Sequence, residues 1–320
     1  MRIRPDHERV VLTGMGAITA LGLNVKDSWQ GMVEGRSGVD HIALFDASRF
    51  PTTFAGEVKN FAPTDYMPRK EARRIARATQ LSLATASQAM ADAGLERFPE
   101  PEANGLAQRS GALFGTSYGG FGSAEYAIRD YHERGLSRVN PFSLAASLPN
   151  MVTAQVCLRF NLQGYTSTVA TACAAGTQAI GEAAEVIRRG KVDLMLAGGL
   201  EAVVIEVVLA GFGAMRALST RNGNPAGASR PFDAERDGFV LGEGSAIFVL
   251  ERLTHAQERG ANIYAEVLGH SVSADTFHIA QPDPQGRYAQ LAMRWALEDA
   301  GVTVDDVDYI NAHGTSTPLG

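Results

Sequence analysis

The sequence is short of cysteine, of basic residues and of long apolar runs, and each shortage argues against a class of protein. Only two of 320 residues are cysteines, Cys157 and Cys173, so we expect no disulfide and no structural zinc site. A net charge of −6, without a long basic tract, argues against nucleic-acid binding. No apolar run reaches the roughly 18 residues that span a membrane, and the N-terminus lacks a signal-peptide core. We therefore expect a cytoplasmic protein with no metal, nucleic-acid partner or membrane segment.

What is present is ordinary globular composition, with 45% hydrophobic and 20% charged residues. Short apolar runs, among them Arg9–Thr13, Arg109–Thr116 and Lys191–Gly199, alternate with segments of helical periodicity. Buried strands that alternate with helices predict an α/β fold whose mostly parallel sheets are covered on both faces.

One stretch joins a predicted strand to a predicted helix at a cysteine. Ser167–Ala172 is small and β-branched, which predicts a buried strand, and Ala174–Arg189 has apolar residues at helical spacing. Gly190 ends the helix. Cys173 stands at the joint.

The position of Cys173 has a chemical consequence. The first turn of a helix offers unpaired N–H groups and a positive partial charge, which favour the thiolate and could hold an oxyanion. Small neighbours such as Ala172, Ala174 and Gly176 leave room for a substrate. On this stretch alone, a buried structural cysteine is an equally good interpretation.

A basic run opens what the sequence predicts to be one helical region, Met67–Gly94. Its first half carries five cations, Arg69, Lys70, Arg73, Arg74 and Arg77. Such a run is either a solvated helix face or a docking surface for an acidic partner, and both interpretations stay open here.

The chain also contains a partial internal repeat. The helical segment Gln80–Gly94 resembles Ala289–Gly301, and the strand predicted after each, Ala112–Ser117 and Tyr309–Ser316, ends in Gly-Thr-Ser. In the second copy His313 replaces a core aromatic residue at the carboxyl end of the strand, where sites in parallel sheets lie.

Several collinear motifs then point to one family. ATACAAG around Cys173, RPFDAERDGFVLGEG over Arg230–Gly244 and NAHGTSTPLG around His313 resemble the β-ketoacyl-[acyl-carrier-protein] synthases, most closely the elongating type II branch. The N-terminal VVLTGMGAITALG and the turn ALSTRN fit the same order. The resemblance covers essentially the whole chain and implies a thiolase-like fold, layered α-β-α-β-α, that forms homodimers.

The resemblance also implies roles for individual residues. Cys173 matches the family's nucleophile, and His313 matches the first of its two catalytic histidines. Thr315 and Thr317 match threonines that contact the phosphopantetheine arm, and Tyr118 and Phe212 are assigned to substrate binding. Docking of the acyl carrier protein is assigned to five cations: Arg69, Lys70, Arg73, Arg74 and Arg216. Because the family has a smaller residue at Tyr118, we expect a shortened or reshaped acyl pocket.

The implied reaction is a decarboxylative Claisen condensation of malonyl carrier protein with an acyl group held as a thioester on Cys173, in fatty acid elongation. No cofactor is implied, since the substrates are carried on phosphopantetheine. Two alternatives stay open: a polyketide-type ketosynthase, and a non-condensing dimer partner or fragment. Inactive partners in this family typically lose the cysteine, which is present here.

The chain stops at Gly320 directly after a motif-like turn, from which we expect a truncated second half. The predicted division is an N-terminal thiolase-like half over 1–255 and the start of the C-terminal half over 256–320. In the family, a second histidine, a lysine and a Gly-Phe-Gly loop follow, and these are expected beyond Gly320.

Overall fold

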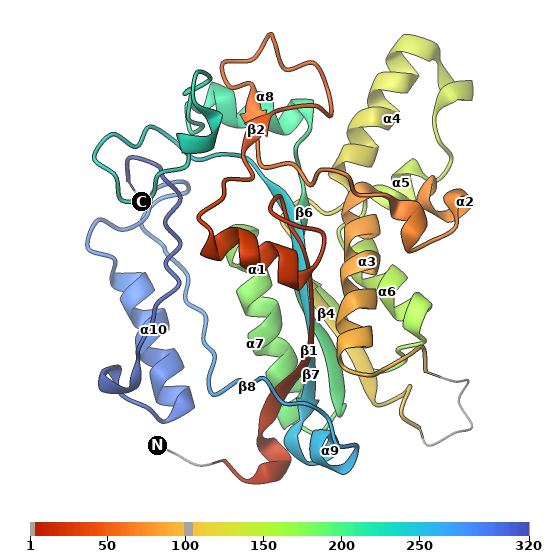
Figure 1. Ribbon diagram of the computed structural model, residues 1–320, viewed down its shortest axis with the longest axis vertical. Coiled ribbons are helices and arrows are strands. Elements are labelled where there is room, and N and C mark those ends of the chain that lie inside the picture. Colours follow the sequence, from red (N-terminus) through yellow and green to blue (C-terminus); the bar gives the residue numbers. More distant parts are fainter. Residues whose placement is uncertain (1–3, 99–104, 320) are drawn as a thin grey trace.

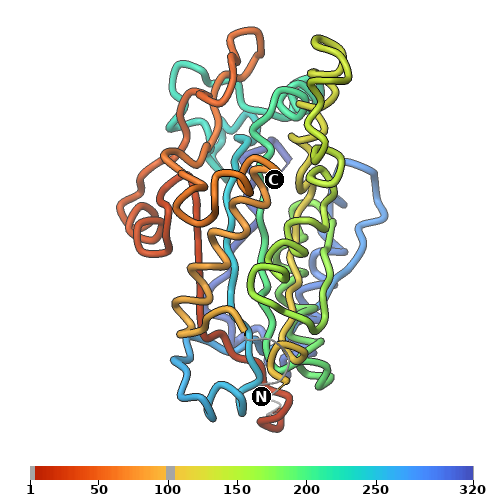
Figure 2. Tube along the Cα trace, turned by 90° about the vertical axis from the view of Figure 1, so that its right-hand side faces the viewer, coloured from red at the N-terminus to blue at the C-terminus, as the bar shows by residue number. Residues whose placement is uncertain are grey.

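The computed structural model describes residues 4–98 and 105–319, and residues 1–3, 99–104 and Gly320 lie outside the described part. Its centre is a six-stranded sheet in the order β5-β4-β6-β7-β1-β8, with helices on both faces (Figure 1). Figure 2, turned by 90°, shows the narrow, elongated profile of this arrangement, with the described N-terminal residues at its lower end.

The strands of the main sheet are β1 (Val10–Ile18), β4 (Ser110–Gly115), β5 (Thr166–Val169), β6 (Leu194–Ala202), β7 (Glu243–Arg252) and β8 (Ala265–Glu266), and a separate pair is β2 (Asp40–His41) with β3 (Phe54–Ala55). The α-helices are α1 (Val25–Val33), α2 (Arg69–Ala72), α3 (Arg77–Asp92), α4 (Phe121–Arg134), α5 (Ser143–Ser147), α6 (Met151–Phe160), α7 (Ala175–Arg188), α8 (Glu206–Ala214), α9 (Leu253–Glu258) and α10 (Arg287–Ala300). Short 3-10 turns are η1 (Asp6–Glu8), η2 (Pro63–Asp65), η3 (Leu136–Arg138), η4 (Ala172–Ala174), η5 (Pro225–Gly227) and η6 (Val304–Asp306). None of the described helices has the length and apolarity needed to cross a membrane.

The central strands are buried on both faces. In β4, Ala112 and Phe114 belong to the core shared with α3 and α6, whereas Leu113 packs with α7 on the opposite face. Strand β6 divides its residues in the same way. Because successive side chains of a strand point to opposite faces, helices on both sides require an unbroken apolar run. The α/β class predicted from those runs is confirmed.

The prediction of mostly parallel strands is wrong, because the sheet is mixed. Strand β4 pairs in parallel with β5 and β6. The pairs β6–β7, β7–β1 and β1–β8 are antiparallel. Since helices cover both faces, the antiparallel strands are as apolar as the parallel ones, and composition does not distinguish them.

The single helical region predicted over Met67–Gly94 is broken. Helix α2 ends at Ala72, and α3 begins at Arg77 after a turn. The Arg77 guanidinium donates hydrogen bonds of 2.8 and 2.7 Å to Glu243 of β7, whose side chain is buried. Arg77 is therefore half-buried and pairs with a buried carboxylate.

The strand predicted over Tyr309–Ser316 does not form. The last described strand is β8, which pairs with Val11 and Leu12 of β1. No strand is assigned to Tyr309–Ser316, so His313 does not end a strand. A strand exists only by pairing with a neighbour, and no described strand pairs with this segment. The preceding helix α10 forms as predicted.

Candidate active site

Cys173 lies in the 3-10 turn η4, immediately before α7 begins at Ala175. The strand before it is shorter than predicted, since β5 ends at Val169. Ala172 has φ +51°, a left-handed conformation that non-glycine residues rarely adopt, so the chain turns sharply just before the cysteine. The Cys173 side chain is exposed and Cys157 is half-buried. The interpretation of Cys173 as a buried structural residue is therefore wrong.

Glycines bring the first turn of α7 close to the sheet. A Cβ atom at Gly115 of β4 would lie 2.1 Å from the carbonyl carbon of Ala175, and one at Gly199 of β6 would lie 2.8 Å from Cα of Gly176. Both distances are shorter than real Cβ atoms tolerate. The position of Cys173 at the end of the sheet therefore requires glycine on two neighbouring strands.

Cys173 opens into a cavity of about 640 Å³. Four other residues assigned to the substrate line the same cavity: Tyr118, Phe212, Thr315 and Thr317. They come from the loop after β4, from α8 and from the segment after His313. The Thr315 and Thr317 hydroxyl oxygens lie 3.0 Å apart. Residues far apart in the sequence therefore form one site.

His313 lies beside this cavity and outside its wall. The described residues that line the cavity include Gly314, which follows it directly, but not the histidine itself. The His313 side chain is exposed. The structure thus places the predicted histidine directly before Gly314, a residue of the cavity wall.

Glu201 is a residue of the site that the sequence analysis missed. It lines the cavity from β6 and accepts hydrogen bonds from the Ser117 N–H at 2.6 Å, the Tyr118 N–H at 3.3 Å and the Thr116 hydroxyl at 3.2 Å. Burial raises the pKa of Glu201 above its usual value, against the lowering effect of these hydrogen bonds. The sequence signal that could have identified Glu201 is a charged residue at the end of an otherwise apolar strand.

Four of the predicted docking cations form one basic surface. Arg69, Lys70, Arg73 and Arg74 border a depression with Asn140, Pro141 and Phe142. Arg74 also stacks over the Phe142 ring, with 4.7 Å from its guanidinium carbon to the ring centroid. We call Arg69, Lys70, Arg73 and Arg74 the basic surface below.

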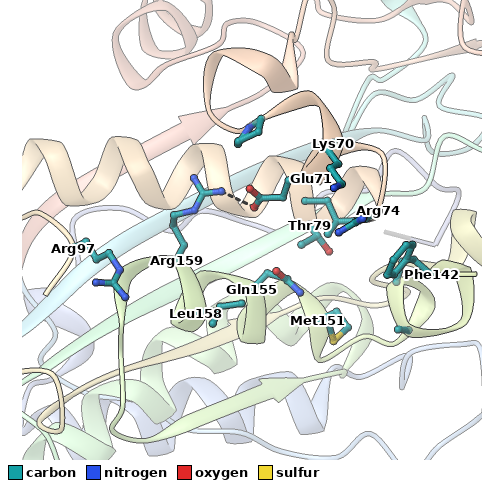
Figure 3. A pocket seen from close by; sticks show the side chains of 14 residues that line it. Lys70, Glu71, Arg74, Thr79, Arg97, Phe142, Met151, Gln155, Leu158 and Arg159 are labelled. Carbon is teal, nitrogen blue, oxygen red and sulfur yellow. Dashed lines mark hydrogen bonds and ion pairs between the residues drawn. The ribbon is translucent and has the colours of Figure 1, made fainter. Parts of the chain in front are cut away.

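A cavity of about 700 Å³ adjoins the basic surface (Figure 3). Lys70 and Arg74 line it together with Leu158 and Arg159 of α6. Glu71 pairs with Arg159 at 2.5 Å, which ties α2 to α6. Among the described residues, no group of three or more His, Cys, Asp or Glu is arranged to hold a metal ion.

Arg216, the fifth predicted docking cation, lies elsewhere. It follows α8 with φ +55° and is exposed. In Figure 1, α8 lies at the top of the molecule, whereas α2, which carries Arg69 and Lys70, lies at its right-hand side. Arg216 comes four residues after Phe212 of the thiol cavity, and it is not among the described residues that border the depression at the basic surface.

Comparison with known proteins decides the family. The model of the "Beta-ketoacyl synthase, N-terminal domain" matches residues 7–256, and that of the "Beta-ketoacyl synthase, C-terminal domain" matches residues 264–320. The chain belongs to the β-ketoacyl synthase family. The predicted resemblance is confirmed.

Individual ketosynthases agree with this assignment. The chain is 43% identical over 315 residues to 3-oxoacyl-[acyl-carrier-protein] synthase 2 of Staphylococcus aureus (strain N315), a match that covers 98% of this chain and 75% of that protein. A β-ketoacyl synthase crystal structure from Burkholderia phymatum STM815 matches with a TM-score of 0.85 and 38% identity, over 98% of this chain and 75% of that one. The thiolase-like fold class is thereby confirmed.

A polyketide ketosynthase is also similar. The chain matches a chain of the AntDE:AntF structure with a TM-score of 0.84 and 29% identity. That structure is of a type II PKS acyl-carrier protein in complex with its ketosynthase bound to the hexaketide. The match covers 97% of this chain and 74% of that one.

Proposed function

We propose that this chain is a β-ketoacyl-[acyl-carrier-protein] synthase, an acyltransferase that joins an acyl group on Cys173 to malonyl carrier protein in fatty acid elongation. The observation that carries the proposal is the single cavity that brings the exposed Cys173 together with Thr315 and Thr317. A cysteine thiolate is a nucleophile, and a walled cavity beside it can hold an acyl chain.

The first step transfers the acyl group to the protein. The Cys173 thiolate attacks the carbonyl carbon of the acyl thioester, a new C–S bond forms, and the phosphopantetheine thiolate leaves and takes up a proton. The oxyanion that develops needs N–H donors, which the first turn of a helix provides. We assign Thr315 and Thr317 to the pantetheine arm, and Tyr118 and Phe212 to the acyl chain.

The second step forms the carbon–carbon bond. Malonyl thioester loses carbon dioxide, and its α-carbon attacks the acyl carbonyl on Cys173. The C–S bond then breaks, the β-ketoacyl product stays on the carrier, and the thiolate is restored. We assign His313 to hydrogen-bond donation toward the enolate oxygen. Decarboxylation supplies the driving force, so we propose that no metal or redox cofactor takes part.

The proposed partners are an acyl carrier protein and a second copy of this chain. The basic surface suits an acidic carrier, and the AntDE:AntF complex shows a related ketosynthase bound to its carrier protein. For the homodimer, the support is strand β5, an edge strand whose outer side pairs with no other strand among the described residues. Light scattering tests the dimer, for which we expect twice the mass of one chain.

We propose a cytoplasmic location for this protein. Thiols are kept reduced in the cytoplasm, and both cysteines are unpaired in the structure.

One alternative has a specific observation in its favour. The similarity to AntDE:AntF supports a polyketide-type ketosynthase with the same nucleophile and another acyl chain.

The division of the chain into two thiolase-like halves, with the boundary between residues 255 and 256, stays a prediction.

Acylation of Cys173 tests the proposal. The protein is incubated with octanoyl carrier protein, and the adduct is mapped by mass spectrometry. We expect one octanoyl group on Cys173, loss of acylation on the order of 10³-fold or more in Cys173→Ala, and normal acylation in the matched control Cys157→Ala. Malonyl-dependent chain extension is measured in parallel. Octanoyl groups found on Cys157, or on neither cysteine, would reject the assignment.

A further inference from the structure

We propose that Arg236 is a positioning residue that holds the turn carrying Thr315 and Thr317 in the shape that receives the pantetheine arm. The inference rests on the proposed function, because it assumes that these threonines bind that arm. Arg236 itself does not line the cavity formed by the described residues, so it acts through the turn.

The turn that carries Thr315 and Thr317 includes a serine in a backbone conformation that serine does not favour. Gly314 has φ +45° and Ser316 has φ +67°, so a left-handed residue stands on each side of Thr315. Serine rarely adopts this conformation, which persists only where surrounding contacts fix it. Ser316 is fully buried, consistent with such constraint.

The constraining contacts come from residues 229–239. The Ser316 carbonyl accepts a hydrogen bond of 3.1 Å from the Gly238 N–H. The Ser316 hydroxyl accepts one of 3.0 Å from the Arg230 N–H. The strained residue is thus held from both sides by a segment about eighty residues earlier in the chain.

Arg236 extends this hold past Ser316. Its Nε donates to the Thr317 carbonyl at 2.9 Å, and its Nη2 donates to the Pro318 carbonyl at 2.9 Å. Its Nη1 donates to the Asp233 carbonyl at 2.9 Å, which fixes the guanidinium to its own segment. A planar fork can bind three carbonyls in fixed directions, whereas the single ammonium of lysine cannot reproduce that geometry.

The holding segment is itself anchored at the cavity. Ser229 and Phe239, at its two ends, both line the cavity. Within it, the Arg230 guanidinium lies 2.8 Å from Asp233 and holds the pKa of that carboxyl below its usual value. The hydrogen bonds that the Arg236 guanidinium donates therefore connect the segment that forms one wall of the cavity to the turn that forms another.

The test compares two reagents that reach the same thiol. Octanoyl-pantetheine carries the arm that the turn should recognise, and iodoacetamide does not. In Arg236→Ala we expect a rise of about tenfold in the octanoyl-pantetheine concentration that half-saturates Cys173 acylation, with the iodoacetamide rate unchanged. Arg236→Lys should recover only part of the loss. The matched control Arg294→Ala, an exposed arginine on α10, should leave both rates unchanged.

Hydrogen exchange provides a readout that needs no substrate. We expect faster exchange at the amides of residues 314–317 in Arg236→Ala, with the sheet unaffected. Unchanged exchange together with unchanged half-saturation would overturn the inference, and so would an equal slowing of both reagents. If the native chain is not acylated at all, the proposed function fails, and the exchange result alone decides the role of Arg236.

Discussion

At the residue scale, Tyr118 forms part of the wall of the thiol cavity. The Tyr118 ring lies 5.8 Å from the Phe121 ring, centroid to centroid, and its backbone N–H is bound by Glu201. The backbone hydrogen bonds to Glu201 fix the position from which the bulky Tyr118 side chain enters the cavity wall. We therefore expect Tyr118 to limit the length of acyl chain that fits.

Tyr118→Ala tests this limit. Removing the ring lengthens the cavity, so kcat/KM for a palmitoyl thioester should rise about tenfold relative to a butyryl thioester, because each additional buried methylene stabilises binding. Acylation of Cys173 is measured with both chains. Tyr126→Ala, an exposed tyrosine on α4, is the control. The same change for both chain lengths would show that Tyr118 does not set the preference.

At the scale of elements, the break between α2 and α3 separates a half-buried arginine from a group of exposed cations. Arg77 pairs with buried Glu243, while the basic surface stays at the molecular surface on α2 and the turn after it. The Glu71–Arg159 pair fixes α2 to α6, so the basic surface is presented on a tethered support. A surface of this kind attracts acidic partners in a salt-dependent way.

The double variant Lys70→Glu, Arg73→Glu tests docking of the carrier. We expect KM for the acyl carrier substrate to rise about tenfold, with little change for octanoyl-pantetheine, which lacks the carrier. The salt dependence of KM should also weaken. The double variant Lys191→Glu, Arg294→Glu reverses two exposed charges outside the basic surface and therefore controls for net charge. If KM for the carrier substrate stays the same in the double variant, the basic surface is only a solvated face.

At the scale of the whole molecule, a buried carboxylate joins the sheet to α9. Glu251 of β7 is fully buried and bonds to Arg259 at 2.9 and 2.5 Å, to His255 at 2.6 Å and to the Thr13 hydroxyl of β1. Burial alone would raise the pKa of Glu251, but these hydrogen bonds outweigh it and lower the pKa to about 2.

This lowered pKa predicts a pH-dependent stability. A carboxyl whose pKa falls from 4.5 unfolded to about 2 folded stabilises the fold above about pH 4.5, and the contribution is lost as the pH falls toward 2. Glu251→Gln should lower the free energy of unfolding by about 3 kcal/mol at pH 7. Urea denaturation should show the difference from the native chain shrinking below pH 4.5. Glu258→Gln, exposed on α9, should cost little at any pH, and a pH-independent difference for Glu251→Gln would contradict the assignment.

The sequence by itself determined the α/β class, the family and the position of Cys173 between a strand and α7, because these depend on local periodicity and contiguous motifs. Only the tertiary structure decided the mixed strand directions, the break before Arg77 and the hydrogen bonds of Glu201 and Arg236. Each of these depends on partners far away in the chain. A strand direction needs a neighbouring strand, and a buried charge or a strained turn needs donors and acceptors that the fold brings to it.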